Sequence, residues 1–412
     1  MSDIALSKLL TELPETTRNS TTGALDNLKR TRAINRILQD LQDYGDWDWT
    51  RRTRKFDYID GVREYSLQNY IGATCLDNDG LATIGDFKTP HNLRITSETY
   101  SPFDFQNIKD VRYNINAGRN INEFGIDNDL IVINFPRQTS SQVHNCDSLT
   151  ATGTITASGD ATNLTIDEVE FYEGTGALNF DISAGTAMTI LFSGMVSLDL
   201  AALKNVSHWT VRIDLPTITN FTSVRLRWGN DSSNYWEKTE TARADGQSLE
   251  AGRNLFAFKW ADSGETGTPD AAAVDWAQIT ITYSASTTDT DFRIDDLRVG
   301  KRVKMELDYY SLAMVKTSAG SYQLEFNPDG SDGQPVQTDK LIEGSSSRLT
   351  VIRGATHECF EIIGGKSERD RTDSFKKYEI SRAQLFKKRG HRLRREGRTL
   401  SFPGVRGRGI GN

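Results

Sequence analysis

Four aspartates gather within eight residues of the chain, and their carboxylates are the first candidates for chemistry: Asp289, Asp291, Asp295 and Asp296. Two carboxyl groups roughly 5–10 Å apart across a cleft can hydrolyse a glycosidic bond, and carboxylate oxygens also suit a hard cation. Clustering in sequence does not make a cleft, so we interpret these residues as strand-end and turn aspartates. The sequence contains no phosphate-loop, dinucleotide, nucleophile-elbow or HExxH zinc motif. We therefore expect no enzyme.

Aromatic residues offer a second kind of chemistry, because flat rings stack on the faces of sugar rings. Four of them fall in one Trp-rich region, namely Trp228, Tyr235, Trp236 and Trp260. The same residues could equally form a hydrophobic core, since tryptophan is mostly buried in folded proteins. Both interpretations stay open on the sequence.

The charge distribution gives a third candidate. The chain has 412 residues and a net charge of −7, but residues 381–412 hold ten Lys or Arg and a single acid, Glu396. A basic arm on an acidic body is typical of a segment that docks to an acidic partner.

The helices and strands expected around these residues divide the chain into several parts. Length alone predicts two or three domains. Residues 1–20 are polar and are interpreted as an extended arm. Residues 24–44 have apolar side chains at helical spacing, with Thr22 as the N-cap and Gly45 as the stop. Residues 50–140 look β-rich, with a hairpin at Asp60-Gly61 and strands at 108–113 and 130–135.

The middle of the chain changes character. Over residues 141–300 short alternating strands recur between Ser, Thr, Gly, Asn and Asp, which predicts an inserted β-sandwich or jelly roll. A strand at 304–310 and two helices at 339–363 and 366–388 follow. We thus expect a discontinuous domain (21–140 with 301–390), an insert (141–300) and an extended basic tail (391–412).

Several classes are excluded by composition. No apolar run approaches the ~18 residues of a membrane span, and Cys75, Cys146 and Cys359 are too far apart to predict a disulfide framework or a metal pair. The first residues lack the basic and apolar regions of a signal peptide, so we expect synthesis in a host cytoplasm.

The insert resembles the galactose-binding-like jelly rolls of carbohydrate-binding modules, through residues 173–180 (EGTGALNF), 225–236 (RLRWGNDSSNYW) and 292–297 (FRIDDL). The resemblance implies sugar binding by Trp228, Tyr235, Trp236 and Trp260. It also implies a structural calcium, for which Asp147, Glu173 and Asp295 are the candidate ligands.

The flanking sequence resembles the head-to-tail adaptors of tailed bacteriophages, including the podovirus tail tubular A type. A first helix ends at Trp47 and Trp49, and a short β part, a strand, two late helices and a basic C-terminus follow. The expected fold class is therefore α+β, with a helical-bundle adaptor domain that has a small β part and carries an inserted all-β jelly roll.

This second resemblance implies a structural virion protein located in the neck. It would form a ring, often of twelve copies, between the portal protein and the tail or nozzle proteins, and extend the channel through which DNA is ejected. The residues expected to dock on the portal are Arg392, Arg394, Arg395, Arg398, Phe402, Arg406 and Arg408. The alternative is a virion glycan-binding or host-attachment protein that acts through the insert.

Overall fold

The computed structural model describes residues 3–17, 24–59, 61–67, 87–96, 102–119, 122–135, 140–151, 153–318, 322–327, 336–342, 344–363 and 368–391. Several expectations fall outside these ranges: the Thr22 cap, the first residue of the Asp60-Gly61 turn, and all seven candidate portal-docking residues, Arg392, Arg394, Arg395, Arg398, Phe402, Arg406 and Arg408. Within the described ranges no helix is long and apolar enough to cross a membrane.

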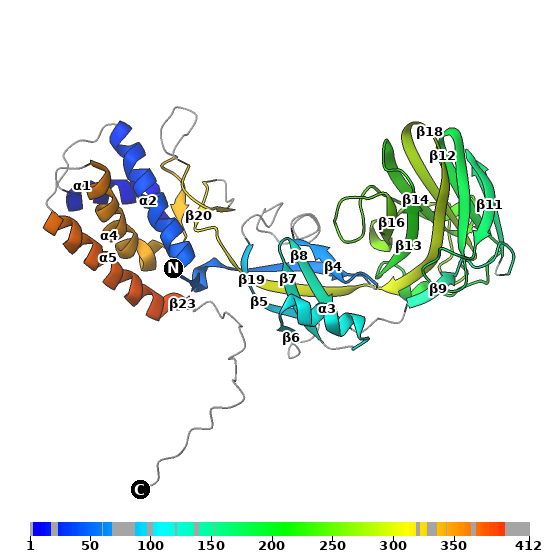
Figure 1. Ribbon diagram of the computed structural model, residues 1–412, viewed down its shortest axis with the longest axis horizontal. Helices are drawn as coiled ribbons and strands as arrows, with labels where there is room; N and C mark the ends of the chain where they lie inside the picture. The colour runs from blue at the N-terminus through cyan, green and yellow to red at the C-terminus, as the bar shows by residue number, and fades with distance from the viewer. Residues whose placement is uncertain are drawn as a thin grey trace, which may run out of the picture.

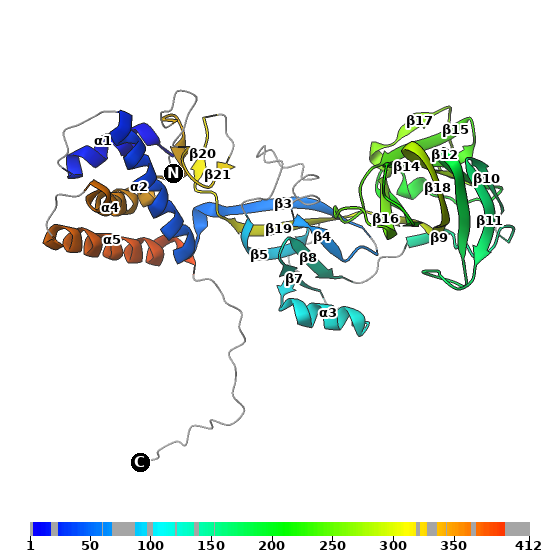
Figure 2. The same ribbon diagram turned by 45° about the horizontal axis from the view of Figure 1, so that its top comes forward.

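The described elements form three units arranged along the long axis of the molecule (Figure 1). A helical unit lies at one end, a seven-stranded sheet lies in the middle, and a large β-sandwich lies at the other end. The second view shows the same order, with β3 and β19 running along the middle unit from the helices toward the sandwich (Figure 2).

The helical unit contains four helices: α1 (Leu6–Thr17), α2 (Ala24–Tyr44), α4 (Gly344–Ile363) and α5 (Glu368–Arg389). The predicted helix at 24–44 is confirmed. The expected extended arm is wrong, because Leu6, Leu9, Leu10 and Leu13 recur at helical spacing and are buried in the core of this unit. Six two-residue strands complete the described part of it: β1 (Ile4–Ala5), β2 (Asp46–Trp47), β20 (Val315–Lys316), β21 (Tyr322–Gln323), β22 (Lys340–Leu341) and β23 (Gly390–His391). Strand β2 pairs with β23.

The middle unit is a sheet built from both sides of the insert. Its order is β3 (Arg51–Tyr58), β19 (Val303–Ser311), β5 (Phe87–Ile95), β6 (Pro102–Phe105), β7 (Glu123–Asp127), β8 (Leu130–Asn134) and β4 (Glu64–Ser66). Residues 108–113, expected as a strand, lie in helix α3 (Ile108–Asn116). The side chain of Asn107 accepts a hydrogen bond from the N–H of Lys109 and so caps this helix.

The expected fold class is therefore wrong. The chain is mostly β, and its flanking sequence does not form a helical bundle with a small β part. Strand β3 precedes the insert and β19 follows it, yet the two pair along eight residues, from Arg51 opposite Tyr310 to Tyr58 opposite Val303. Backbone hydrogen bonding between segments more than 240 residues apart has no local signature in the sequence, which is why the size of this sheet was underestimated.

The sandwich comprises ten strands. They are β9 (Ser140–His144), β10 (Thr154–Gly159), β11 (Ala161–Asp167), β12 (Ala177–Ser193), β13 (Ser207–Leu215), β14 (Phe221–Asp231), β15 (Asn234–Glu240), β16 (Gly252–Lys259), β17 (Gly264–Thr266) and β18 (Trp276–Lys301).

Two long strands, β12 and β18, contribute to both layers of the sandwich. The first half of β18 pairs with β14, and its second half pairs with β13 and β9. Register shifts along the β12–β18 ladder lie between these halves, at 180–187 on β12, as expected where strands bend from one layer into the other. A single cluster of buried residues fills the space between the layers.

One outer face of the sandwich is partly covered by the middle unit. Leu255 and Ala257 on β16 pack against the core of the middle sheet, and the Ser66 N–H donates a 2.8 Å hydrogen bond to the Asp245 carbonyl. The rest of that face, toward the Gly252 end of β16, carries the charged side chains of the candidate site.

Candidate functional site

The aromatic residues predicted to stack on sugars do not form an open surface. Trp228 is 0% exposed, and Trp236 and Trp260 are buried with it in the core between the layers. Their ring centroids lie 5.0–5.7 Å apart in the Trp228–Trp260 and Trp236–Trp260 pairs. A ring enclosed on both faces cannot stack on a ligand, so the structure corrects this expectation in favour of the core interpretation.

Tyr235 lies elsewhere but is also buried. It is outside the core cluster, and the Arg227 guanidinium carbon lies 4.6 Å from its ring centroid.

A signal for the burial of Trp228 was present in the sequence. Val224, Leu226 and Trp228 alternate with arginines, which places all three apolar side chains on one face of a strand.

The outer face of the other layer carries a set of charged side chains on three neighbouring strands. On β13, Val211 and Ile213 point into the core, so Arg212 and Asp214 point outward. In the ladder Asp214 is paired with Arg253 on β16 and with Arg293 on β18. One cross-strand row thus reads Arg253, Asp214, Arg293. In the adjoining row Arg212 is paired with Asp295.

A loop between β11 and β12 lies over this face, and three carboxylates hold its backbone. Asp167 accepts hydrogen bonds from the N–H groups of residues 169 and 170 at 2.9 and 3.2 Å. Asp295 accepts from Tyr172 and Glu173 at 2.6 and 3.2 Å. Asp147 accepts from residues 175 and 176 at 2.8 and 2.9 Å. The loop is therefore fixed by buried and half-buried acceptors and not by its own hydrophobic contacts.

Tyr172 is the exposed one of two neighbouring aromatic residues in this loop, the other being the half-buried Phe171. The guanidinium carbons of Arg212 and Arg253 lie 4.6 and 4.5 Å from its ring centroid, in cation–π geometry. The residue remains 38% exposed, so part of the ring is still accessible to a ligand. Sequence reasoning missed it, since it lies in a loop and not in one of the aromatic strands.

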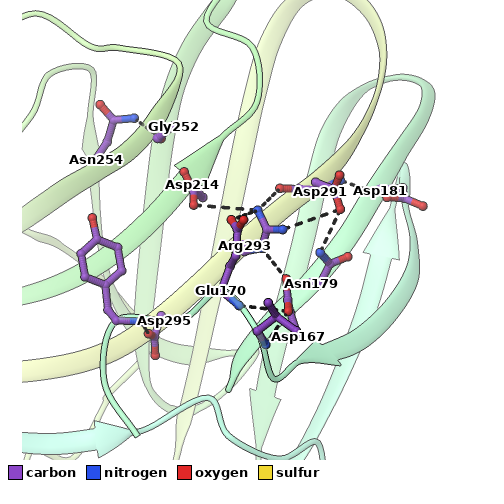
Figure 3. A network of polar contacts seen from close by, with 12 residues as sticks. Asp167, Glu170, Asn179, Asp181, Asp214, Gly252, Asn254, Asp291, Arg293 and Asp295 are labelled. Atoms are coloured by element: carbon purple, nitrogen blue, oxygen red, sulfur yellow. Dashed lines mark hydrogen bonds and ion pairs between the residues drawn. The ribbon is translucent and has the colours of Figure 1, made fainter. Parts of the chain in front are cut away.

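Arg293 is the centre of an ion-pair network on the same face (Figure 3). Its Nε lies 2.8 Å from Asp167 Oδ2, and its terminal nitrogens lie 3.4 Å from Glu170 and 4.0 Å from Asp214. Asp291 lies 3.9 Å away. The Arg293 guanidinium is thus shared among four carboxylates, which occupies its donors and ties the loop to β13 and β18.

The pKa shifts follow from burial and from these contacts. Burial raises the pKa of Asp214, against the opposing charges of Arg293 and Arg253. Burial also raises the pKa of Asp295, against the two loop N–H groups. Hydrogen bonds, first from the Val169 N–H and then from Arg293, lower the pKa of Asp167. Burial raises the pKa of the Tyr172 hydroxyl.

A small cavity lies among these groups. It has a volume of about 10 Å³, and its lining includes Tyr172, Arg212, Arg253, Asp214 and Asp295. That volume holds one water molecule or one hydroxyl group. Asp295 is only 2% exposed, and within the described residues its Oδ1 atom has no hydrogen-bond partner, while Oδ2 is used by the loop. The site therefore offers one buried acceptor beneath an accessible aromatic ring.

The three residues expected to bind calcium, Asp147, Glu173 and Asp295, do lie around this loop, but at least one carboxylate oxygen of each already has another partner. Asp147 and Asp295 accept backbone hydrogen bonds, and Glu173 lies 2.6 Å from the Arg298 guanidinium. Among the residues that the structure describes, no group of three or more His, Cys, Asp or Glu side chains is arranged to hold a metal ion.

The fold separates the four aspartates that lie close together in the sequence, Asp289, Asp291, Asp295 and Asp296. Asp291 is exposed beside Arg293, whereas Asp296 is buried and lies 2.5 Å from Arg298 and 3.2 Å from Gln142. Asp289 accepts a hydrogen bond from the neighbouring Thr290 N–H. Asp295 alone of the four lines the cavity under Tyr172.

No family model matches the chain, and no curated protein matches it. Similar solved structures include a family 11 carbohydrate-binding module from Clostridium thermocellum in complex with a β-1,3-1,4-mixed-linked tetrasaccharide (10% identity, TM-score 0.29, covering 39% of this chain and 95% of that one). A family 30 module of a C. thermocellum cellulosomal cellulase has 11% identity and a TM-score of 0.31, covering 40% and 98%. The CBM22-1 xylan-binding domain of Paenibacillus barcinonensis Xyn10C has 11% identity and a TM-score of 0.25, covering 40% and 96%.

These similar structures are carbohydrate-binding modules, the class that the insert was expected to resemble. The strand order and the single buried core define the sandwich independently of these weak similarities. The expected resemblance to head-to-tail adaptors finds no support in the comparisons.

Proposed function

We propose that this chain is a glycan-binding protein and that the outer face of the sandwich around Tyr172 is its ligand surface. A sugar ring would lie against the accessible part of the Tyr172 ring. The rigid loop and the network around Arg293 would fix that ring in position, so that little conformational entropy is lost when a ligand binds.

The observation that carries this proposal is the pairing of Tyr172 with Asp295. A tyrosine that is 38% exposed lies above a cavity of about 10 Å³ that is lined by a buried carboxylate with a free oxygen. A buried acceptor without a partner is costly, so a donor is expected to fill it. A sugar supplies both parts of the match, because its C–H face packs on an aromatic ring and its hydroxyl donates a hydrogen bond.

The small volume also defines the mode of binding. A cavity that admits one hydroxyl cannot enclose a monosaccharide, so the ligand would lie on the surface and insert a single group. Such surface binding suits a polymer that extends beyond the site better than a free sugar.

The experiment is a glycan array probed with the full-length chain and two variants. We expect the parent chain to bind, and Tyr172→Ala to weaken binding roughly threefold to tenfold, the range of an aromatic contact. Tyr113→Ala is the matched control, because Tyr113 lies on α3 and is 63% exposed. A blank array for the parent chain would refute the proposal, and so would equal binding by all three proteins.

The adaptor role stays a separate proposal. It comprises the ring, the portal and tail partners and the neck location, and it rests on sequence order and on the basic segment beyond residue 391. It is tested by negative-stain microscopy of the chain mixed with the portal protein of the same genome. Rings capping the portal would support this role, and monomers that ignore the portal would count against it.

A further inference from the structure

The charges on the Tyr172 face are not all neutralised in the same way. Arg293 lies within 4.0 Å of four carboxylates. Asp296 lies 2.5 Å from Arg298 Nε and 3.8 Å from Arg212 Nε, so it also has a close cationic partner. Asp295 is occupied on one side by the N–H groups of the loop.

Arg253 differs from the other arginines of this face. Within the described part of the chain it forms no ion pair within 4.0 Å, and its guanidinium carbon lies 4.5 Å from the centroid of the Tyr172 ring. Its cross-strand partner Asp214 lies 4.0 Å from Arg293 instead. Arg253 therefore makes no close ion pair within the described residues of this face, although its charge opposes the rise in the pKa of Asp214 that burial causes.

The geometry of that contact determines what Arg253 can bind. A guanidinium carries its N–H donors in one plane, and contact with an aromatic ring leaves these donors available for other acceptors. Those donors match the two oxygens of a carboxylate, which arginine binds through two parallel hydrogen bonds. The site thus places an unpaired carboxylate-binding group beside the ring proposed to hold a sugar.

We infer, on the basis of the proposed function, that the Tyr172 face selects acidic glycans that carry uronic acid residues. In this arrangement the Arg253 guanidinium binds the carboxylate of the sugar, the Tyr172 ring packs against the pyranose face, and Asp295 Oδ1 accepts a hydrogen bond from a hydroxyl.

The test compares uronate polymers with their neutral counterparts. Polygalacturonate, alginate and hyaluronate are each presented to the full-length chain beside the same polymer after carboxyl reduction, and affinity is measured by native affinity electrophoresis. We expect at least one acidic polymer to bind about tenfold more tightly than its reduced form, as loss of a charge-assisted hydrogen-bonded pair predicts.

Three variants test whether Arg253 causes the preference for acidic polymers. Arg253→Gln should abolish the difference between acidic and reduced polymers. Arg253→Lys keeps the charge without the paired donors and should retain only part of it. Arg225→Gln is the matched control, because Arg225 lies on β14 with its core neighbours Val224 and Leu226 facing the other way, and it should leave the preference unchanged.

The outcomes separate this inference from the proposed function. Equal binding of acidic and reduced polymers, or binding of reduced polymers only, would overturn the inference and leave glycan binding intact. Binding of poly-glutamate as tightly as the best uronate would also overturn it, because the site would then recognise acidic chains in general. Failure to bind any glycan, acidic or neutral, would refute the proposed function itself.

Discussion

Ser140, at the start of the sandwich, is paired with Gly300, at its end, in antiparallel register. The chain therefore enters and leaves this unit through adjacent strands, β9 and the last part of β18. Close ends allow a domain to be inserted into a loop of another without disturbing it. The pairing also places the exit of the sandwich directly before β19, the strand that rejoins the middle sheet.

The first prediction concerns the independence of this unit. A fragment of residues 140–301 contains its own buried core and ten strands, so we expect it to fold alone with a cooperative thermal transition. It would expose Leu255, Ala257 and Ala244, which contact the middle sheet in the full chain. The measurement is calorimetry of the fragment beside the full chain. A fragment without a cooperative transition would show that the sandwich depends on that contact.

The second prediction concerns the loop that carries Tyr172. Gly174 has φ of +83°, and a Cβ at this position would overlap the carboxylate of Asp147, which holds the loop. Gly194 has φ of +60° with open space around its Cβ position. Both alanine substitutions place a Cβ on a left-handed backbone, which lowers the free energy of unfolding by about 1 kcal/mol. Only Gly174→Ala should also lose hydrogen bonds to Asp147, a further ~1–2 kcal/mol.

Urea unfolding of the two variants measures that difference. Equal free energies of unfolding for Gly174→Ala and Gly194→Ala would mean that Asp147 can move aside at no cost, and that the loop is not fixed by this carboxylate.

The third prediction separates the core aromatic residues from the surface one. Trp228→Ala removes a fully buried ring from the cluster with Trp209 and Trp260, and should lower the free energy of unfolding by about 3–5 kcal/mol. Tyr113→Ala, at an exposed position, should change it by less than about 0.5 kcal/mol. Circular dichroism melts measure both. A stable Trp228→Ala variant would contradict the placement of this ring in the core.

The fourth prediction concerns acid stability. Burial lowers the pKa of His208 to about 3 and that of His144 to about 4. The Cys146 N–H also donates to His144 Nδ1 at 2.9 Å, which requires that nitrogen to be unprotonated. Unfolded histidine titrates near ~6.5. Between about pH 6.5 and these lower values the unfolded chain binds more protons, so the stability due to these groups is lost as pH falls.

The His208→Gln variant separates the contribution of His208 from that of opposing groups such as Glu240. Burial raises the pKa of Glu240 to about 6. The variant should lose stability less steeply than the parent chain between pH 6 and pH 4, by at most about 1.4 kcal/mol per pH unit. The measurement is urea unfolding at a series of pH values. Parallel curves for parent and variant would contradict a neutral, buried His208.

Local patterns in the sequence were sufficient to predict several helices and strands. The spacing of apolar residues at 24–44 predicted α2, and alternation at residues 209–215 and 254–260 predicted β13 and β16. These patterns are local because side-chain direction repeats every 3.6 residues in a helix and every two in a strand. At residues 108–113 the pattern is ambiguous and predicts a strand, whereas these residues form α3, whose start is marked by the Asn107 cap.

The candidate site could not be predicted from local sequence patterns. Tyr172, Arg212, Arg253 and Asp295 come from one loop and three strands spread over about 120 residues. Their meeting depends on the register that pairs Asp214 with both Arg253 and Arg293. A shift of one residue in either ladder would turn these side chains into the core.

Composition and periodicity are properties of neighbouring residues, so they predict a helix after residue 23, a long strand-rich insert and a basic C-terminal segment without any knowledge of the fold. The folded chain is needed to see that Trp228 is enclosed, that Tyr172 is exposed, and that Arg253 has no ion pair among the described residues. Burial and charge pairing depend on which distant strands lie side by side, and that is set by the packing of the whole sandwich.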